Sequence, residues 1–170
     1  MTRRKARKNP EVATYENTRQ IAEAINWGRN WRPDPLHGFL DVAMNPRKFQ
    51  AHINAGAKKF GDCDDYALYW ATTLLKSGLA DKAYMGTVWY ENRDKKGEGH
   101  AVCVFEKEGD TYWADYGMPH KIAAGDEWAW AKDVVASRRS VLYAAGKFEI
   151  KLRRNGEPKL VKRTGKRYLP

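Results

Sequence analysis

The stretch "GDCDDYALYWATTLLKSGL", residues 61–79, predicts the most distinctive element of this chain. Its apolar residues recur at i, i+3, i+4 and i+7, the spacing of one face of a helix. These positions are Ala67, Trp70, Ala71 and Leu74. Gly78 suits the left-handed conformation with which many helices end. We therefore expect a helix that begins close to Cys63 and ends before Gly78.

Cys63 is one of only two cysteines, and its neighbours are acidic. A cysteine that only packs is at home in an apolar run, whereas Cys63 follows Asp62 and precedes Asp64 and Asp65. A thiol at the start of a helix is partly solvated, and the helix dipole favours its thiolate. The two acids after it suit the first helical turn but oppose a thiolate by like charge. An imidazolium must therefore supply most of the stabilisation of the thiolate.

The composition predicts one globular domain in a reducing setting. The chain has 170 residues, of which 42% are hydrophobic and 12% aromatic. No apolar run reaches the roughly 18 residues that cross a bilayer, and no apolar segment follows the basic start as in a secretory signal. Two cysteines make no disulfide framework. We expect a cytoplasmic or virion-associated protein without a membrane span.

The net charge of +10 gathers at the two ends of the chain. Residues 1–8 carry five basic side chains, and residues 147–170 carry nine basic and two acidic ones, so the segment between them is near −2. We divide the chain into a basic N-terminal arm (1–9), a domain (10–146) and a basic C-terminal extension (147–170). Such ends favour non-specific contact with polyanions or with neighbouring proteins. No motif for reading bases accompanies them.

The remaining pattern predicts helices first and then an antiparallel sheet, the α+β class. A first helix would begin at Asn9 and Pro10 and end near Gly28. The proline-rich segment 31–49 looks like a loop that wraps the core. The expected strands are 83–91, 100–106, 111–117 and 140–152, with a short helix over 126–139.

Three residue types that cysteine hydrolysis requires occur in the order Cys63, His100, Asp115. A thiolate attacks a carbonyl, an imidazole moves the proton, and a third group orients the imidazole. His100 opens one predicted strand and Asp115 closes the next, so antiparallel pairing would place them side by side. Strand alternation turns Cys103 away from His100 and into the core.

The oxyanion hole and possible metal sites are less defined by the sequence. The backbone N–H of Cys63 is one expected oxyanion donor, and a second would come from Gln50, Asn54 or Trp31. A zinc site fails on spacing, because no CxxC or HxxxH occurs. We expect no metal and no cofactor. The other histidines have no partner pattern and stay unassigned: His37, His52 and His120.

Three segments together resemble the transglutaminase-like branch of the papain-like cysteine enzymes. They are "GDCDDYALYWATTLLKSGL", "GEGHAVCVF" and "YWADYG", and Cys63, His100 and Asp115 match the family's cysteine, histidine and aspartate one by one. The upstream "WRPDPLHGFLDVAMNP" is also similar to small bacterial and phage-encoded members. The resemblance implies helices packed on an antiparallel sheet, with the nucleophile at the start of a central helix.

Two functions of different classes follow from these features. The first is a cysteine hydrolase or acyltransferase that acts on peptide or isopeptide bonds through a Cys63 thioester. Cleavage is favoured over cross-linking because the domains of dedicated cross-linking enzymes are lacking; peptidoglycan stem peptides would suit the basic ends. The second is a structural or accessory protein of a nucleoprotein assembly, such as a phage virion, that keeps the fold. An open groove at Cys63 would favour the enzyme.

Overall fold

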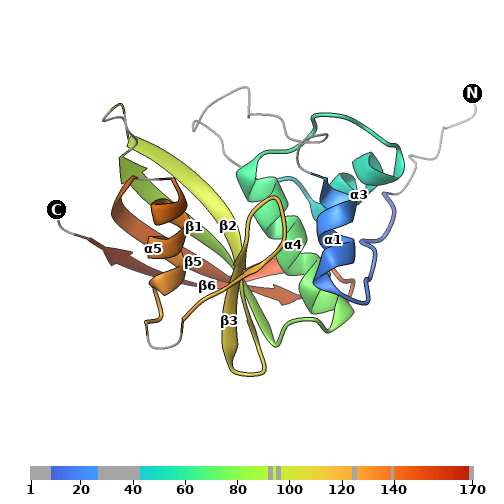
Figure 1. Cartoon of the computed structure of the whole chain (residues 1–170). Helices are drawn as coiled ribbons and strands as arrows, with labels where there is room; N and C mark the ends of the chain where they lie inside the picture. The colour runs from blue at the N-terminus through green and yellow to red at the C-terminus, as the bar shows by residue number, and fades with distance from the viewer. Residues whose placement is uncertain are drawn as a thin grey trace, which may run out of the picture.

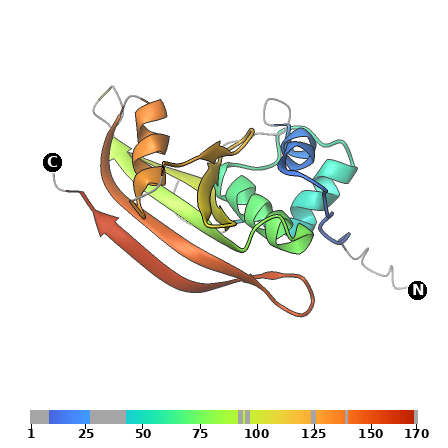
Figure 2. The same cartoon turned by 60° about the horizontal axis from the view of Figure 1, so that its bottom comes forward.

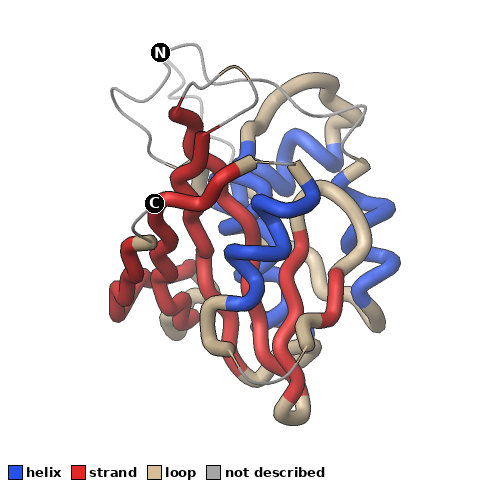
Figure 3. The backbone as a smooth tube through the Cα atoms, turned by 60° about the vertical axis from the view of Figure 1, so that its left-hand side comes forward, coloured by secondary structure: helices blue, strands red, loops and turns tan. Residues whose placement is uncertain are grey.

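The computed structural model describes residues 9–26, 43–91, 94, 97–123, 126–138 and 140–168. Its strands form one antiparallel sheet in the order β4-β3-β2-β1-β5-β6, with helices on both sides (Figures 1 and 3). The helices are α1 (Thr18–Ile25), α3 (Pro46–Asn54), α4 (Cys63–Ser77) and α5 (Ala129–Ser137). The strands are β1 (Lys82–Glu91), β2 (Gly97–Lys107), β3 (Asp110–Ala114), β4 (His120–Lys121), β5 (Val141–Leu152) and β6 (Pro158–Arg167). The expected α+β class is observed.

Each face of the sheet carries its own hydrophobic core. Successive side chains of a strand point to opposite faces, so Cys103 and Phe105 of β2 pack with α4 while Val102 and Val104 pack with α5. Figure 1 shows α4, with α1 and α3 beyond it, on one side of the strands and α5 on the other. The sheet is therefore the middle of three layers.

Helix α4 follows the predicted bounds because its two ends are capped. The Asp62 side chain accepts from the backbone of Asp65, and the Asp65 side chain accepts from the backbone of Asp62, which is a capping box. At the other end Gly78 has φ 67°, which a residue without a Cβ adopts at little cost. Such caps contribute about 1 kcal/mol to helix stability.

The first helix begins later than the sequence predicts. Residue Asn17, not Asn9, caps α1, and the helix ends at Asn26 rather than near Gly28, which lies outside the described residues. Before Asn17, backbone N–H groups donate to side chains of other elements. The N–H of Ala13 donates to Gln50 of α3, and the N–H of Tyr15 donates to Ser77 of α4. These long-range bonds replace the helical ones.

The segment expected to be a loop over 31–49 ends in a helix. Asn45 caps α3 by accepting a hydrogen bond from the N–H of Arg47, and Pro46 occupies the first turn. Proline is well suited to this position because its missing donor would be unpaired there. Proline is also common in loops, so Pro46 by itself does not distinguish the start of a helix from a loop. Residues 31–42 lie outside the described part of the chain.

The basic C-terminal segment continues the sheet. The boundary that we expected between residues 146 and 147 falls inside β5, and residues 158–167 form β6, which pairs with β5 in antiparallel register. Figure 2 shows the two strands as a long ribbon along one border of the molecule. The arm at residues 1–9 lies outside the described part except for Asn9. Among the described residues, no helix is long and apolar enough to cross a membrane.

The close approach of α5 to β1 generates the first prediction. A Cβ on Gly86 would lie 2.8 Å from Val104 Cγ2 and 2.9 Å from the Trp130 ring. We expect Gly86→Ala to lower the free energy of unfolding by about 1–3 kcal/mol, the cost of overpacking a core. Chemical denaturation measures it. Gly117→Ala is the control, since a Cβ there meets nothing within 4 Å. An unchanged midpoint for Gly86→Ala would contradict this packing.

Candidate active site

His100 and Asp115 are in direct contact. The Nε2 atom of His100 lies 2.8 Å from Oδ2 of Asp115, and His100 is only 8% exposed. An ionised carboxylate only accepts hydrogen bonds, so Nε2 carries the proton in this contact. In the neutral ring Nδ1 then holds the lone pair that can accept a proton. The contact therefore sets the ring in a tautomer that a general base requires.

The contact lies where β2 loses a neighbour. Strand β3 pairs with residues 103–107 of β2. The pairing ends where Ala114, the last residue of β3, lies opposite Cys103. Residues 97–102 of β2 have no described pairing on that side, although their other side pairs with β1. Asp115 follows directly after β3, so the chain leaves the ladder and the carboxylate reaches His100.

Two tyrosines connect this place to the start of α4. The ring of Tyr116 is 5.0 Å from that of Tyr66, edge to face, and 5.8 Å from that of His100. Tyr66 lies one helical turn after Cys63. By strand alternation His100 belongs to the α5 face, together with Val102, whereas α4 covers the other face. Side chains of the two faces thus approach one another around the edge of β2 beyond the end of β3.

Cys63 is the first residue of α4, and its side chain is partly buried. The first hydrogen bond of the helix runs from the N–H of Tyr66 to the carbonyl of Asp62, so the N–H of Cys63 precedes the helical ladder. This is the position where the helix dipole favours an anion. His100 thus contacts Asp115 directly. Cys63 lies one helical turn before Tyr66, whose ring packs on Tyr116 next to them.

Arg138, which the sequence did not single out, also contacts Asp115. Its Nη2 lies 3.0 Å from Oδ2, the oxygen that His100 also approaches. Arg138 is the residue that ends α5. Sequence alone gives no signal for it, because "ASRR" looks like an ordinary basic helix end and only the packing of α5 on the sheet brings it to Asp115. The carboxylate is thereby held by groups from two elements.

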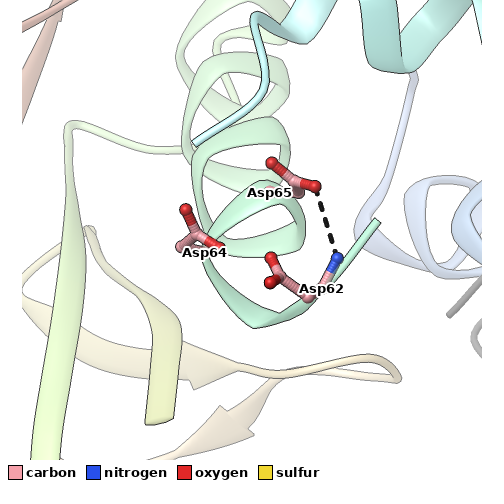
Figure 4. Close-up of side chains that lie close together, drawn as sticks. All are labelled: Asp62, Asp64 and Asp65. Carbon is pink, nitrogen blue, oxygen red and sulfur yellow. Dashed lines mark hydrogen bonds between the residues drawn. The ribbon is translucent and has the colours of Figure 1, made fainter. Parts of the chain in front are cut away.

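Three acidic side chains at the start of α4 form a cluster (Figure 4). The nearest ligand atoms of Asp62, Asp64 and Asp65 all lie within 4.8 Å of one another. Oxygen ligands at this spacing suit a hard cation. Asp65 is already engaged, since it accepts from the backbone N–H groups of Met44 and Asp62. These bonds explain why an acid stands at residue 65 without invoking a metal.

Of the second oxyanion donors that the sequence offers, Gln50 and Asn54 lie within the described residues. Gln50 is 3% exposed; its Oε1 accepts from Ala13 N and Tyr69 Oη, and its Nε2 donates to Asn54. Tyr69 is six residues along α4 from Cys63. These contacts tie α3, α4 and the N-terminal segment together, a structural role for Gln50 and Asn54. Trp31 lies outside the described residues.

Two of the three unassigned histidines, His52 and His120, lie within the described residues, and each stacks on an aromatic ring. His52 stacks on Phe60 at 4.8 Å, and partial burial followed by the charge of Lys48 lowers its pKa. His120 stacks on Trp113 at 4.4 Å. His37 lies outside the described residues. Neither described histidine has a contact with His100 or Asp115 among those the structure shows.

Comparison with known proteins gives only a distant likeness. No family model matches the chain, and no curated protein matches it. Two solved structures of Legionella pneumophila LapG, one of them EGTA-treated, are similar at 19% and 20% identity and a TM-score of 0.42. Each comparison covers 74% of this chain and 61% of LapG, so the chain spans about three fifths of that protein. A likeness of this size does not assign a family.

The two cysteines differ in a way that alkylation can measure. Cys103 is fully buried, and burial raises the pKa of its thiol. We expect iodoacetamide to modify Cys63 faster by on the order of 100-fold, because a buried thiol reacts only when the structure opens. Peptide mapping by mass spectrometry follows both sites. His100→Ala should slow Cys63 alone. Equal rates at the two cysteines would show that Cys63 is an ordinary thiol.

Proposed function

We propose that this chain is a cysteine hydrolase or acyltransferase that acts on amide bonds, with Cys63 as nucleophile, His100 as general base and acid, and Asp115 as the group that orients His100. One observation carries the proposal. It is the 2.8 Å contact between His100 Nε2 and Asp115 Oδ2, at the edge of β2 beyond the end of β3. A buried histidine oriented by a carboxylate, next to a helix that begins with a cysteine, is the arrangement that thiol catalysis requires.

The first half of the reaction forms a thioester. His100 Nδ1 takes the proton of the Cys63 thiol, and Sγ attacks the carbonyl carbon of the substrate amide. The resulting oxyanion collapses, the carbon–nitrogen bond breaks, and the imidazolium of His100 gives its proton to the leaving amine. Asp115 accepts the Nε2–H throughout and stabilises the imidazolium. Cys63 ends this step acylated, and an amine has left.

The second half releases the acyl group. His100 takes a proton from a water molecule, which attacks the thioester carbon, and the Cys63 sulfur leaves as a thiolate that regains the proton. A carboxylic acid is released. If an amine takes the place of water, the same steps transfer the acyl group and form a new amide. We propose a peptide or isopeptide as the substrate, and cleavage as its fate.

The start of α4 supplies the first oxyanion donor in this mechanism. The N–H of Cys63 lies before the helical ladder, where backbone donors point away from the helix body. A donor at this position can stabilise the negative charge that develops on the carbonyl oxygen when the Cys63 sulfur attacks the carbonyl carbon. Removing one such donor from a hydrolase typically costs about 10²–10³ in kcat.

Turnover by matched variants tests the proposal. We expect the chain to cleave members of a library of internally quenched peptides, Cys63→Ala to abolish cleavage, and His100→Ala to lower kcat by about 10²–10⁴, the usual contribution of a general base. Hydroxylamine should trap the thioester as a hydroxamate. His52→Ala is the control, because the described contacts of His52 include neither His100 nor Asp115. Cleavage by Cys63→Ala at an unchanged rate would contradict the mechanism.

Arg138 gives a second test, aimed at the orientation of Asp115. Losing this ion pair should lower kcat by roughly tenfold, because Asp115 would then orient His100 less firmly and small misplacements of a catalytic group slow the reaction strongly. We expect Arg138→Met to lower kcat with little change in KM, because the described ion pair of Arg138 is with Asp115, the residue that orients His100. Arg138→Lys should restore part of the rate. A rise in KM at unchanged kcat would instead place Arg138 in substrate binding.

A further inference from the structure

The sheet ends, among the described residues, in a strand with an unusual charge. Strand β6 is the last in the strand order, so its outer edge has no described partner. It carries no acidic residue in its ten positions. Its basic side chains are all exposed: Lys159, Lys162, Arg163, Lys166 and Arg167. An unpaired edge presents backbone donors and acceptors that can pair with another strand.

The pairing of β6 with β5 distributes these charges over both faces of the sheet. Arg163 lies opposite Phe148 and its guanidinium is 5.3 Å from that ring, which places it on the α4 face. Lys162 lies opposite Glu149 and Lys166 opposite Ala145, a residue of the core on the α5 face. The edge is therefore flanked by positive charge above and below.

From this arrangement we propose that the outer edge of β6 binds an acidic peptide segment in extended conformation, which adds to the sheet as a further strand. Side chains of an added strand alternate between the two faces, so acids at neighbouring positions would meet the basic residues on both. Backbone pairing would supply affinity and the charges would supply selectivity. Leu160 and Val161, 47% and 41% exposed, offer apolar contact beside them.

The distribution of charge disfavours two other partners for the β6 edge, a second copy of β6 and a nucleic-acid duplex. Two copies of β6 placed edge to edge would oppose basic strand to basic strand, and like charges directly opposite destabilise a strand pair. A nucleic-acid duplex would rest on one face and leave the charges of the other face unused. An extended acidic strand along the edge can use both sets. It also requires no change in the β5–β6 ladder.

This surface goes beyond the proposed reaction and is independent of it. His100, Val88, Ala145 and Lys166 stand in register across four neighbouring strands. Three strand spacings separate the first from the last, roughly 14 Å. The β6 edge is thus a separate place on the sheet, and Cys63→Ala should leave its binding unchanged. A result on this edge neither supports nor weakens the assignment of the nucleophile.

Fluorescence anisotropy with a labelled ten-residue peptide tests the proposal on the full chain. The peptide carries Glu and Asp at neighbouring positions among Thr and Val. We expect saturable binding that weakens with salt, since salt screens exposed charges. The double variant Lys162→Glu/Arg163→Glu should weaken binding by about tenfold or more, because it opposes like charges. Arg19→Glu/Lys48→Glu, at exposed positions of α1 and α3, makes the same charge change and should not.

Two further probes separate strand addition from general attraction and need only the unaltered protein. The same peptide N-methylated at every residue keeps its charge and loses the backbone donors of both edges, so we expect it not to bind. A short DNA duplex should not displace the unmethylated peptide. Equal binding of the methylated peptide, or displacement by DNA, would show a mere polyanion patch. Absence of any peptide binding would show that the charges only keep this edge from pairing. Each of these three results overturns the proposal.

Discussion

The early end of β3 is the constraint on which the candidate site depends. The β2–β3 ladder stops where Ala114 meets Cys103, although β2 continues for six residues toward its start. A longer ladder would place Asp115 in a strand and cover the edge of β2. Because the ladder stops, Asp115 turns to His100 on one side while Tyr116 packs on Tyr66 of α4. The early end of β3 thus lets side chains from the two faces of the sheet approach one another.

The site draws on both helical layers as a result. Helix α4 brings Cys63 and Tyr66 from one face, and the end of α5 brings Arg138 to Asp115 from the other. The place of α5 depends in turn on the absence of a side chain at Gly86, against which the Trp130 ring lies. Packing that looks purely structural therefore sets where the Asp115 carboxylate is held. A change in the α5 core should reach the site through Arg138.

The effect of the charged residues depends on the partners that folding gives them. Along the sequence, the acids around Cys63 oppose a thiolate and the basic C-terminal residues look like an arm. In the structure Asp65 is engaged by backbone N–H groups at the start of α4. Hydrogen bonds from backbone N–H groups favour the ionised form of a carboxylate, so they account for an acid at this position. The basic residues of β6 alternate between the two faces of the sheet, so their positive charge lies on both sides of one strand edge.

The sequence by itself determined the elements whose signals are local. Helical spacing and two caps defined α4 over Cys63–Ser77, and alternation separated Cys103 from His100. Three motifs in order singled out Cys63, His100 and Asp115 as candidates. Only the tertiary structure decided that α1 begins at Thr18, after its cap Asn17, because Ala13 and Tyr15 bond to partners far along the chain.

Tertiary structure likewise decided the contact of Arg138 with Asp115 and the place of β6 at the edge of the sheet. No local pattern encodes either of them. The α5 residue meets Asp115 through the packing of a helix on a sheet, and β6 finds its register by pairing with β5. Spacing along a chain reports which face a residue occupies, whereas contacts between elements depend on how whole faces and edges fit together.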